Sequence, residues 1–144
     1  MQVHVKAFGE LSPAELYAIL RLRVSVFMLE QNCLYPDLDG LDPQALHVWL
    51  EEDGELAAYL RVLDRGVRTE DVMIGRVIAV KRGCGLGARV MREGILTARE
   101  RFGAGRICLE AQVYAQGFYE KLGFRRVSEP FDEDGIPHVK MLLE

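Results

Sequence analysis

The sequence predicts an α+β fold in which a mixed, mostly antiparallel sheet is flanked by helices. Two strand-like runs meet at a short hairpin signal, Asp53-Gly54, and helical hydrophobic spacing occurs on both sides of this strand-rich region. The chain has 144 residues, 49% of them hydrophobic and 28% charged, which is the size and balance of one domain with one core. We therefore expect a single domain over residues 1–144 that needs neither disulfides nor a structural metal for stability.

The N-terminal half begins with alternating apolar residues over 3–7, as in an edge strand with one buried face. Ser12-Pro13-Ala14-Glu15 then combines a capping residue, a proline at the first helical position and a reciprocal glutamate, which predicts a helix over 13–29. A loop over 32–44 follows, rich in proline and aspartate. Strands are expected over 46–51, 56–63 and 72–80.

The C-terminal half changes from strand to glycine and then to helix directly after Val80. The amphipathic helix ends near Gly103, and a shorter helix over 115–122 is stopped by Gly123. Strands are expected over 107–111, 124–127 and 138–143.

Charge and cysteine content exclude several classes of protein. The net charge of −4 argues against nonspecific nucleic-acid binding, which needs a basic surface. Met1 leads into a segment without the apolar core of a signal peptide, and no stretch approaches the roughly 18 apolar residues of a membrane span. Cys33, Cys84 and Cys108 fit a reducing compartment better than a disulfide framework or a zinc site. We expect a cytoplasmic protein without metal, nucleic-acid or membrane partners.

The segment Arg82-Gly83-Cys84-Gly85-Leu86-Gly87-Ala88 opens the middle helix and predicts an anion site. Glycines let the backbone approach a ligand closely, and the free amides and dipole of a helix N-terminus favour a pyrophosphate. One alternative is a tight turn without a ligand. Another is a dinucleotide fingerprint, Gly83-x-Gly85-x-x-Ala88, with Glu110 as the later acidic residue, but too little chain follows for the further βαβ units of that fold.

Two motifs in this order resemble the GNAT superfamily of acyl-CoA-dependent N-acyltransferases. The first is R/Q-x-x-G-x-G/A, and the second is an alanine, a tyrosine and then Gly-Phe. Their positions are occupied by Arg82, Gly85 and Gly87, and by Ala115, Tyr119, Gly123 and Phe124.

Most of the remaining chain resembles one subgroup, the ElaA-like proteins. One difference is that only Lys81 separates Val80 from Arg82, a shorter connection than is usual in the superfamily. The matching segments are Arg23-x-x-Val26-Phe27-x-x-Glu30-Gln31-x-Cys33-x-Tyr35-x-Asp37-x-Asp39-Gly40-x-Asp42, Gly75-Arg76-Val77-Ile78 and Glu133-Asp134-Gly135-Ile136-Pro137-His138.

The resemblance implies an N-acetyltransferase that uses acetyl-CoA as cosubstrate, without a metal. It implies that the strand carrying Val77, Ile78, Ala79 and Val80 diverges from the strand over 107–111 and binds pantetheine. The amides from Arg82 through Gly83, Cys84, Gly85, Leu86, Gly87 and Ala88 are then expected to bind the pyrophosphate. Tyr119 is expected to contact the cofactor and, because a phenol stays protonated at neutral pH, to protonate the departing thiolate.

The sequence does not decide which residue is the general base or which amine is the acceptor. Glu30, His47, Glu110 and His138 all lie near the ends of expected elements, and of these Glu30 and His138 are the acceptor-side candidates. The acceptor is either a small-molecule amine or a protein amine. The sequence also allows a homodimer that forms through an edge strand. The alternative functions are a noncatalytic acyl-CoA-binding module and an NAD-dependent oxidoreductase.

Three aspartates in the early loop allow two interpretations. Asp37, Asp39 and Asp42 lack the full spacing of a calcium loop. They are expected either to cap local backbone amides or to form a negative rim that attracts a cationic acceptor.

Overall fold

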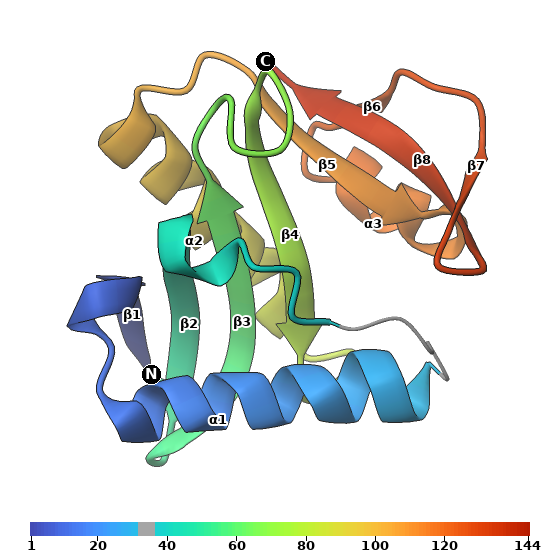
Figure 1. Cartoon of the computed structure of the whole chain (residues 1–144). Coiled ribbons are helices and arrows are strands. Elements are labelled where there is room, and N and C mark those ends of the chain that lie inside the picture. The colour runs from blue at the N-terminus through green and yellow to red at the C-terminus, as the bar shows by residue number, and fades with distance from the viewer. Residues whose placement is uncertain (32–36) are drawn as a thin grey trace.

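The computed structural model describes residues 1–31 and 37–144, so the expectations for Cys33 and Tyr35 lie outside the described residues. Within these ranges eight strands form one sheet in the order β1-β2-β3-β4-β5-β8-β6, and β7 pairs with β8 (Figure 1). All neighbouring strands run antiparallel except β4 and β5. The strands are β1 Gln2–Ala7, β2 Leu46–Glu52, β3 Glu55–Leu63, β4 Val72–Ala79, β5 Ile107–Gln112, β6 Arg125–Arg126, β7 Phe131–Glu133 and β8 Ile136–Leu143. This confirms the predicted mixed, mostly antiparallel sheet.

The helices are α1 Pro13–Arg23, α2 Leu86–Phe102 and α3 Gln116–Glu120, with short 3₁₀ turns at Phe8–Glu10, Asp42–Gln44 and Val113–Ala115. The first helix begins as predicted, because Ser12 Oγ accepts from the Glu15 amide at 3.1 Å and Glu15 accepts from the Ser12 amide at 2.8 Å. Its second part differs from the prediction: Val24–Glu30 is π-helical. The apolar spacing used for the prediction does not separate these two helical forms. Among the helices of the described ranges, none is long and apolar enough to cross a bilayer.

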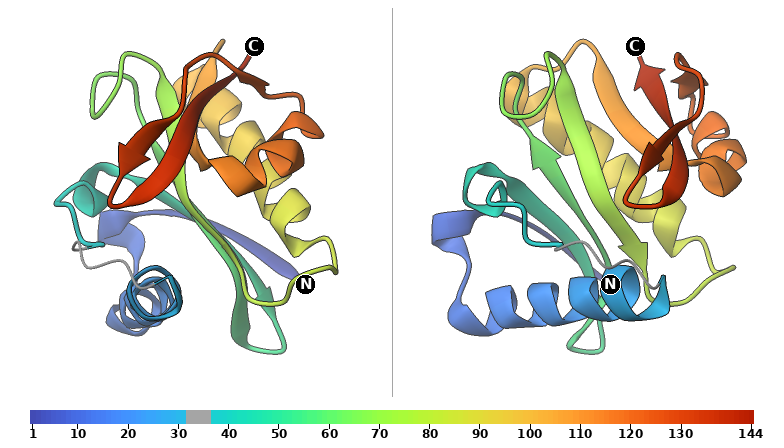
Figure 2. Two further views of the ribbon diagram at one scale, coloured as in Figure 1. Left: turned by 90° about the vertical axis from the view of Figure 1, so that its right-hand side faces the viewer. Right: turned by 45° about the vertical axis from the view of Figure 1, so that its right-hand side comes forward.

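Helices α1 and α2 cover opposite faces of the sheet (Figure 2). Successive side chains of a strand point to opposite faces, so Tyr59 packs with Ile19 of α1, whereas Leu60 packs towards α2. The second contact is close: a Cβ placed on Gly94 of α2 would lie 2.7 Å from Leu60 Cδ2. The glycine at this position lets α2 lie directly on β3.

Strands β4 and β5 diverge after a short parallel ladder. Only Val72 with Ile107 and Met73 with Cys108 are paired, and below these pairs the two strands separate in Figure 1. The predicted divergence of the strand carrying Val77 from the strand over 107–111 is thereby confirmed.

A bulge accompanies this divergence. On the other side of β4, the register advances three residues from Gly75 to Ile78 while β3 moves two, from Arg61 to Tyr59. The extra residue is Arg76, whose φ of 56° is left-handed. The bulge thus lies where β4 leaves β5.

The C-terminal hairpin was not fully predicted. Strand β7 was missed because its three residues include two acids and no apolar alternation. Asp134 and Gly135, with φ of 55° and 80°, form the turn that joins β7 to β8. The expected strand over 124–127 is reduced to Arg125–Arg126. This hairpin matters because it carries Glu133 and His138.

Candidate active site

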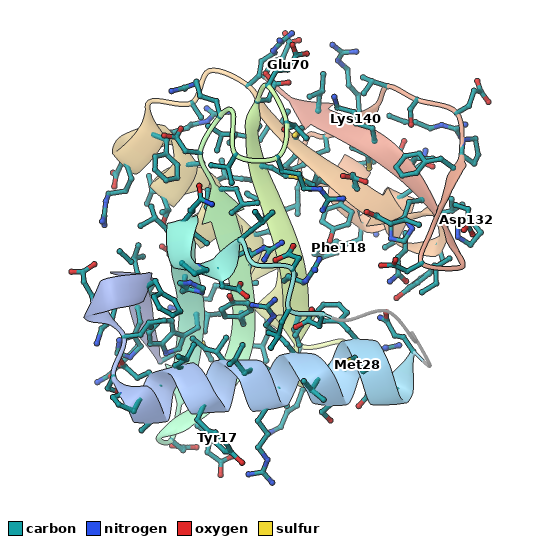
Figure 3. All side chains as sticks on the ribbon, in the orientation of Figure 1. Tyr17, Met28, Glu70, Phe118, Asp132 and Lys140 are labelled. Atoms are coloured by element: carbon teal, nitrogen blue, oxygen red, sulfur yellow. The ribbon has the colours of Figure 1, made fainter. Side chains whose placement is uncertain are left out.

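The glycine loop before α2 has the geometry expected of an anion site. Gly83 and Gly85 have φ of 78° and 79°, and Gly85 is the N-cap of α2. A Cβ on either would meet nothing within 4 Å, so the left-handed backbone is what requires glycine there. Gly87 is different, because its Cβ would lie 3.3 Å from Cζ of Phe118, a side chain of α3 labelled in Figure 3.

The first turn of α2 offers unpaired donors. The first hydrogen bond of the helix runs from the Arg89 amide to the Gly85 carbonyl at 3.0 Å. In the described part of the chain, the amides of Leu86, Gly87 and Ala88 donate no hydrogen bond, and the turn contains no acidic side chain. The free amides and the positive end of the helix dipole therefore lie together at the N-terminus of α2.

The lower half of β4 also has free peptide groups. The Val80 amide donates to the Ala57 carbonyl at 2.9 Å, and Ile78 is opposite Tyr59. Because hydrogen-bonded positions alternate along an antiparallel pair, the peptide groups of Val77 and Ala79 point away from β3. They face the gap that β5 has left.

A cavity of about 160 Å³ lies between the diverging strands, and a second of about 430 Å³ shares part of its wall. The inner cavity is lined by residues of β4, β5 and α3, among them Val77, Glu110 and Tyr119. The outer cavity extends to the β7–β8 hairpin. The residues common to both are Phe27, Gln31, Arg68, Arg76, Gln112, Glu133 and His138.

Tyr119 contributes a protonated phenol to the inner cavity. Its ring packs edge-on against Phe118 and Phe124, with centroids 5.0 and 6.1 Å away. Burial, and secondarily the nearby Tyr114, raises the pKa of Tyr119 to about 12. The hydroxyl is therefore un-ionised at neutral pH and able to donate a proton.

Two carboxylates share one arginine in the wall. Arg68 Nη2 lies 3.2 Å from Glu110 Oε1 and 2.7 Å from Glu133 Oε1. His138 Nε2 is 3.6 Å from Glu133 Oε2, while its Nδ1 lies 2.7 Å from the Ile136 carbonyl. Burial raises the pKa of Glu110, and the neighbouring Glu133 raises it further against the opposing effect of Arg68. This cluster combines a carboxyl group of raised pKa with a histidine.

The three loop aspartates form an ion network with arginines, in which Asp37 and Asp42 are buried and Asp39 is exposed. They are therefore not the free negative rim that one of the two interpretations expected. Arg23 Nε lies 2.7 Å from Asp37 Oδ2, and Arg23 Nη1 lies 2.6 Å from Asp42 Oδ1. Arg61 pairs with Asp39 and Asp42, and Arg76 with Asp37 and Asp39. Sequence spacing does not reveal these partners, which come from α1, β3 and β4.

Electrostatics agree with this arrangement. Burial alone would raise the pKa values of Asp39 and Asp42, but the hydrogen bonds and charges of Arg61 and Arg23 outweigh burial, and both values are lowered. Both carboxylates are thus ionised but neutralised by arginines. Asp39 also accepts from the Leu41 amide at 3.1 Å, so local capping is confirmed for this one residue.

The structure does not bring all the expected residues together. Glu30 is exposed and lines neither cavity. His47 is buried between the Tyr59 hydroxyl at 2.7 Å and the Asp42 carbonyl at 3.0 Å, and burial lowers its pKa, which is a structural role. Cys84 is exposed on the loop, and Cys108 is in the core. Sequence reasoning missed Arg68, because an arginine in a glycine-containing turn looks like an ordinary solvent-exposed side chain.

Comparison with known proteins decides the family. Residues 16–144 match the family model described as acetyltransferase (GNAT) domain. The chain belongs to the GNAT acetyltransferases. Protein ElaA of Escherichia coli is 41% identical over 140 residues, which cover 94% of this chain and 92% of ElaA. A UPF0039 protein of Schizosaccharomyces pombe is 39% identical over 143 residues, with 96% of this chain and 94% of the relative covered.

Solved structures place this GNAT chain in the ElaA-like subgroup. The crystal structure of Escherichia coli ElaA superposes with a TM-score of 0.92 at 38% identity over the whole of both chains. An acyl-CoA N-acyltransferase from Pseudomonas aeruginosa gives the same score at 37% identity, also over both whole chains. The GNAT fold uses an acyl-CoA as donor. The dinucleotide alternative does not fit this topology, because the glycine loop follows a strand that is antiparallel to β3.

Proposed function

We propose that this GNAT chain is an N-acetyltransferase that moves the acetyl group of acetyl-CoA to an amine by direct attack on the thioester. The observation that carries the proposal is the cavity between β4 and β5, which is lined both by Val77, whose peptide groups are unpaired, and by Tyr119, whose phenol stays protonated. Such a cavity suits a thioester held by backbone groups beside a proton donor.

The acetyl-CoA donor would be bound mainly by backbone peptide groups. The amides from Gly83 to Ala88 and the side chain of Arg82 suit the pyrophosphate, and the free peptide groups of Val77 and Ala79 suit pantetheine. Leu86 would contribute only its amide, because its side chain is buried in the core.

The chemistry would be shared between two groups of the inner cavity. The Tyr119 hydroxyl would donate its proton to the sulfur as the thiolate departs, and the Val77 amide would stabilise the negative charge that develops on the carbonyl oxygen. His138 lines the same wall and remains an acceptor-side candidate, whereas Glu30 does not line it.

Calorimetric titration with acetyl-CoA tests donor binding. We expect micromolar affinity, and we expect Gly85→Glu to abolish it. The glutamate would have to adopt the unfavourable left-handed backbone of Gly85, and it would add negative charge at the pyrophosphate position. The matched control is Gly103→Glu at the other end of α2, which has φ of 61° and an open Cβ position. Binding of NADH in place of acetyl-CoA would refute the proposal in favour of an oxidoreductase.

A turnover assay separates catalysis from binding. We expect Tyr119→Phe to slow acetyl transfer about 10²-fold or more while leaving acetyl-CoA affinity nearly intact, because only the proton donor is lost. Unchanged turnover would remove Tyr119 from the mechanism. Tight acetyl-CoA binding without transfer to any amine would support the noncatalytic binding module instead.

A further inference from the structure

The walls of the inner and outer cavities carry more negative than positive charge. They contain five carboxylates and three guanidinium groups, a difference of two negative charges with histidine neutral. Arg61 and Arg76 are already paired within the loop network, which leaves Arg68 for Glu110 and Glu133 together. Asp134, exposed at the outer wall, has no ion pair within the described ranges. The carboxylates are Asp37, Asp39, Glu110, Glu133 and Asp134.

We propose that Glu110 binds the acceptor as a small alkylammonium ion and then takes its proton, so that the acceptors are alkylamines without a carboxylate. This inference rests on the proposed acetyl transfer and names the acceptor class and the general base for it.

The position of Glu110 supports both roles. On β5 it shares a face with Gln112, which is opposite His138 of β8, and its side chain, 19% exposed, lines the inner cavity with Tyr119 and Val77. A carboxylate in this half-buried position lacks a full counter-charge, because its arginine is shared with Glu133 and Lys140, opposite it on β8, forms no ion pair with it. An ammonium ion supplies the missing charge.

The same position makes Glu110 a suitable base. The groups that face it are Arg68 from the β3–β4 loop, Glu133 from β7, and His138 and Lys140 from β8. Burial and Glu133 raise its pKa, so its carboxylate takes up a proton at a higher pH than an ordinary glutamate. A base is most effective when its pKa lies near the working pH.

The transfer balances in protons and bonds. Glu110 accepts one proton from the alkylammonium, and the neutral amine forms a C–N bond with the thioester carbonyl carbon while the C–S bond breaks. Tyr119 gives its proton to the departing sulfur and regains one from the acetylated nitrogen. The products are the N-alkylacetamide, CoA thiol and one proton held by Glu110, which is partly exposed and can release it to water.

Carboxylate-bearing amines are disfavoured by the same charges. An anionic group on the acceptor would need a free cation in the wall. The described arginines of the wall are all paired with aspartate or glutamate, and Lys140 lines neither cavity. The anionic group would also lie among the surplus carboxylates. An amino acid should therefore bind less well than an alkylamine of the same chain length.

Three probes of equal chain length test the inference: butylamine, 1,4-diaminobutane and 4-aminobutyrate, with charges of +1, +2 and 0. We expect kcat/KM for the two alkylamines to exceed that for 4-aminobutyrate at least ten-fold. We expect Glu110→Gln to lower kcat by about 10²-fold or more, and to weaken 1,4-diaminobutane binding to the CoA-loaded protein, with acetyl-CoA affinity unchanged. The matched control is Glu129→Gln, at a side chain that is 97% exposed.

The outcomes separate this inference from the function on which it rests. Preference for 4-aminobutyrate, full activity of Glu110→Gln, or acetyl-CoA binding without acetylation of any probe overturns the inference and leaves donor binding in place. Failure of the unmodified protein to bind acetyl-CoA overturns the proposed function itself. Thermal melting of both variants shows that a loss of activity does not come from unfolding.

Discussion

Arg23→Met is expected to destabilise the protein strongly. Arg23 is fully buried and bonds to Asp37 and Asp42 at 2.7 and 2.6 Å. Its removal leaves these two buried carboxylates with one arginine each, Arg76 and Arg61. Breaking a buried ion pair from one side costs about 3–5 kcal/mol, because the remaining charge is uncompensated. For a chain of this size that corresponds to a melting temperature lower by about 6–20 °C.

Urea denaturation and thermal melting at pH 7 measure this effect. The control is Arg21→Met, an exposed arginine on the same helix, for which a change within about 0.5 kcal/mol is expected. Adding Asp42→Asn to Arg23→Met should recover part of the loss, because it removes one of the two carboxylates that lost a counter-charge. A loss no greater than that of the Arg21 control would refute the assignment of Arg23 as the central cation of the network.

Three further predictions concern stability. Gly94→Ala should cost about 1–3 kcal/mol, because its Cβ would lie 2.7 Å from Leu60 Cδ2, whereas Gly117→Ala has open space and should be close to neutral in the same urea titrations. The lowered pKa of Asp39 adds stability that is present above about pH 4 and is lost as the pH falls further, so Asp39→Asn should flatten the acid limb of a stability–pH curve; an unchanged limb would contradict this. The raised pKa of Glu110 has the opposite sign, since its ionisation on going to neutral pH lowers stability, so Glu110→Gln should melt no lower than the unmodified protein at pH 7, and a lower melting temperature would show that the carboxylate is stabilising.

Local chemistry in the sequence was sufficient to predict most of the fold. The capping box at Ser12, the Asp53-Gly54 hairpin and the glycine at 103 each act within a few residues, and each lies where it was expected. The glycine loop was predictable for the same reason. Strand β7 was not, because its pairing depends on β8 and not on its own three side chains.

The acceptor side was much less predictable. The pairing of Arg68 with Glu110 and Glu133 joins residues 42 and 65 positions apart in the chain, so no motif spacing encodes it. The charge state of the loop aspartates likewise depends on arginines brought there by α1, β3 and β4. Residue types alone allowed either local capping or a negative rim, and the fold instead pairs all three aspartates with arginines.

The bulge at Arg76 links β4 to the loop that lines the outer cavity. Its left-handed backbone is unfavourable for a residue with a side chain, and the guanidinium is held by Asp37 and Asp39 of this loop. The same backbone step determines which peptide groups of β4 point into the gap. In the proposed mechanism, an exchange of the loop over 37–42 would therefore also change the alignment of the thioester, whereas a change in the β7–β8 hairpin would act through the Glu133–Arg68 pair.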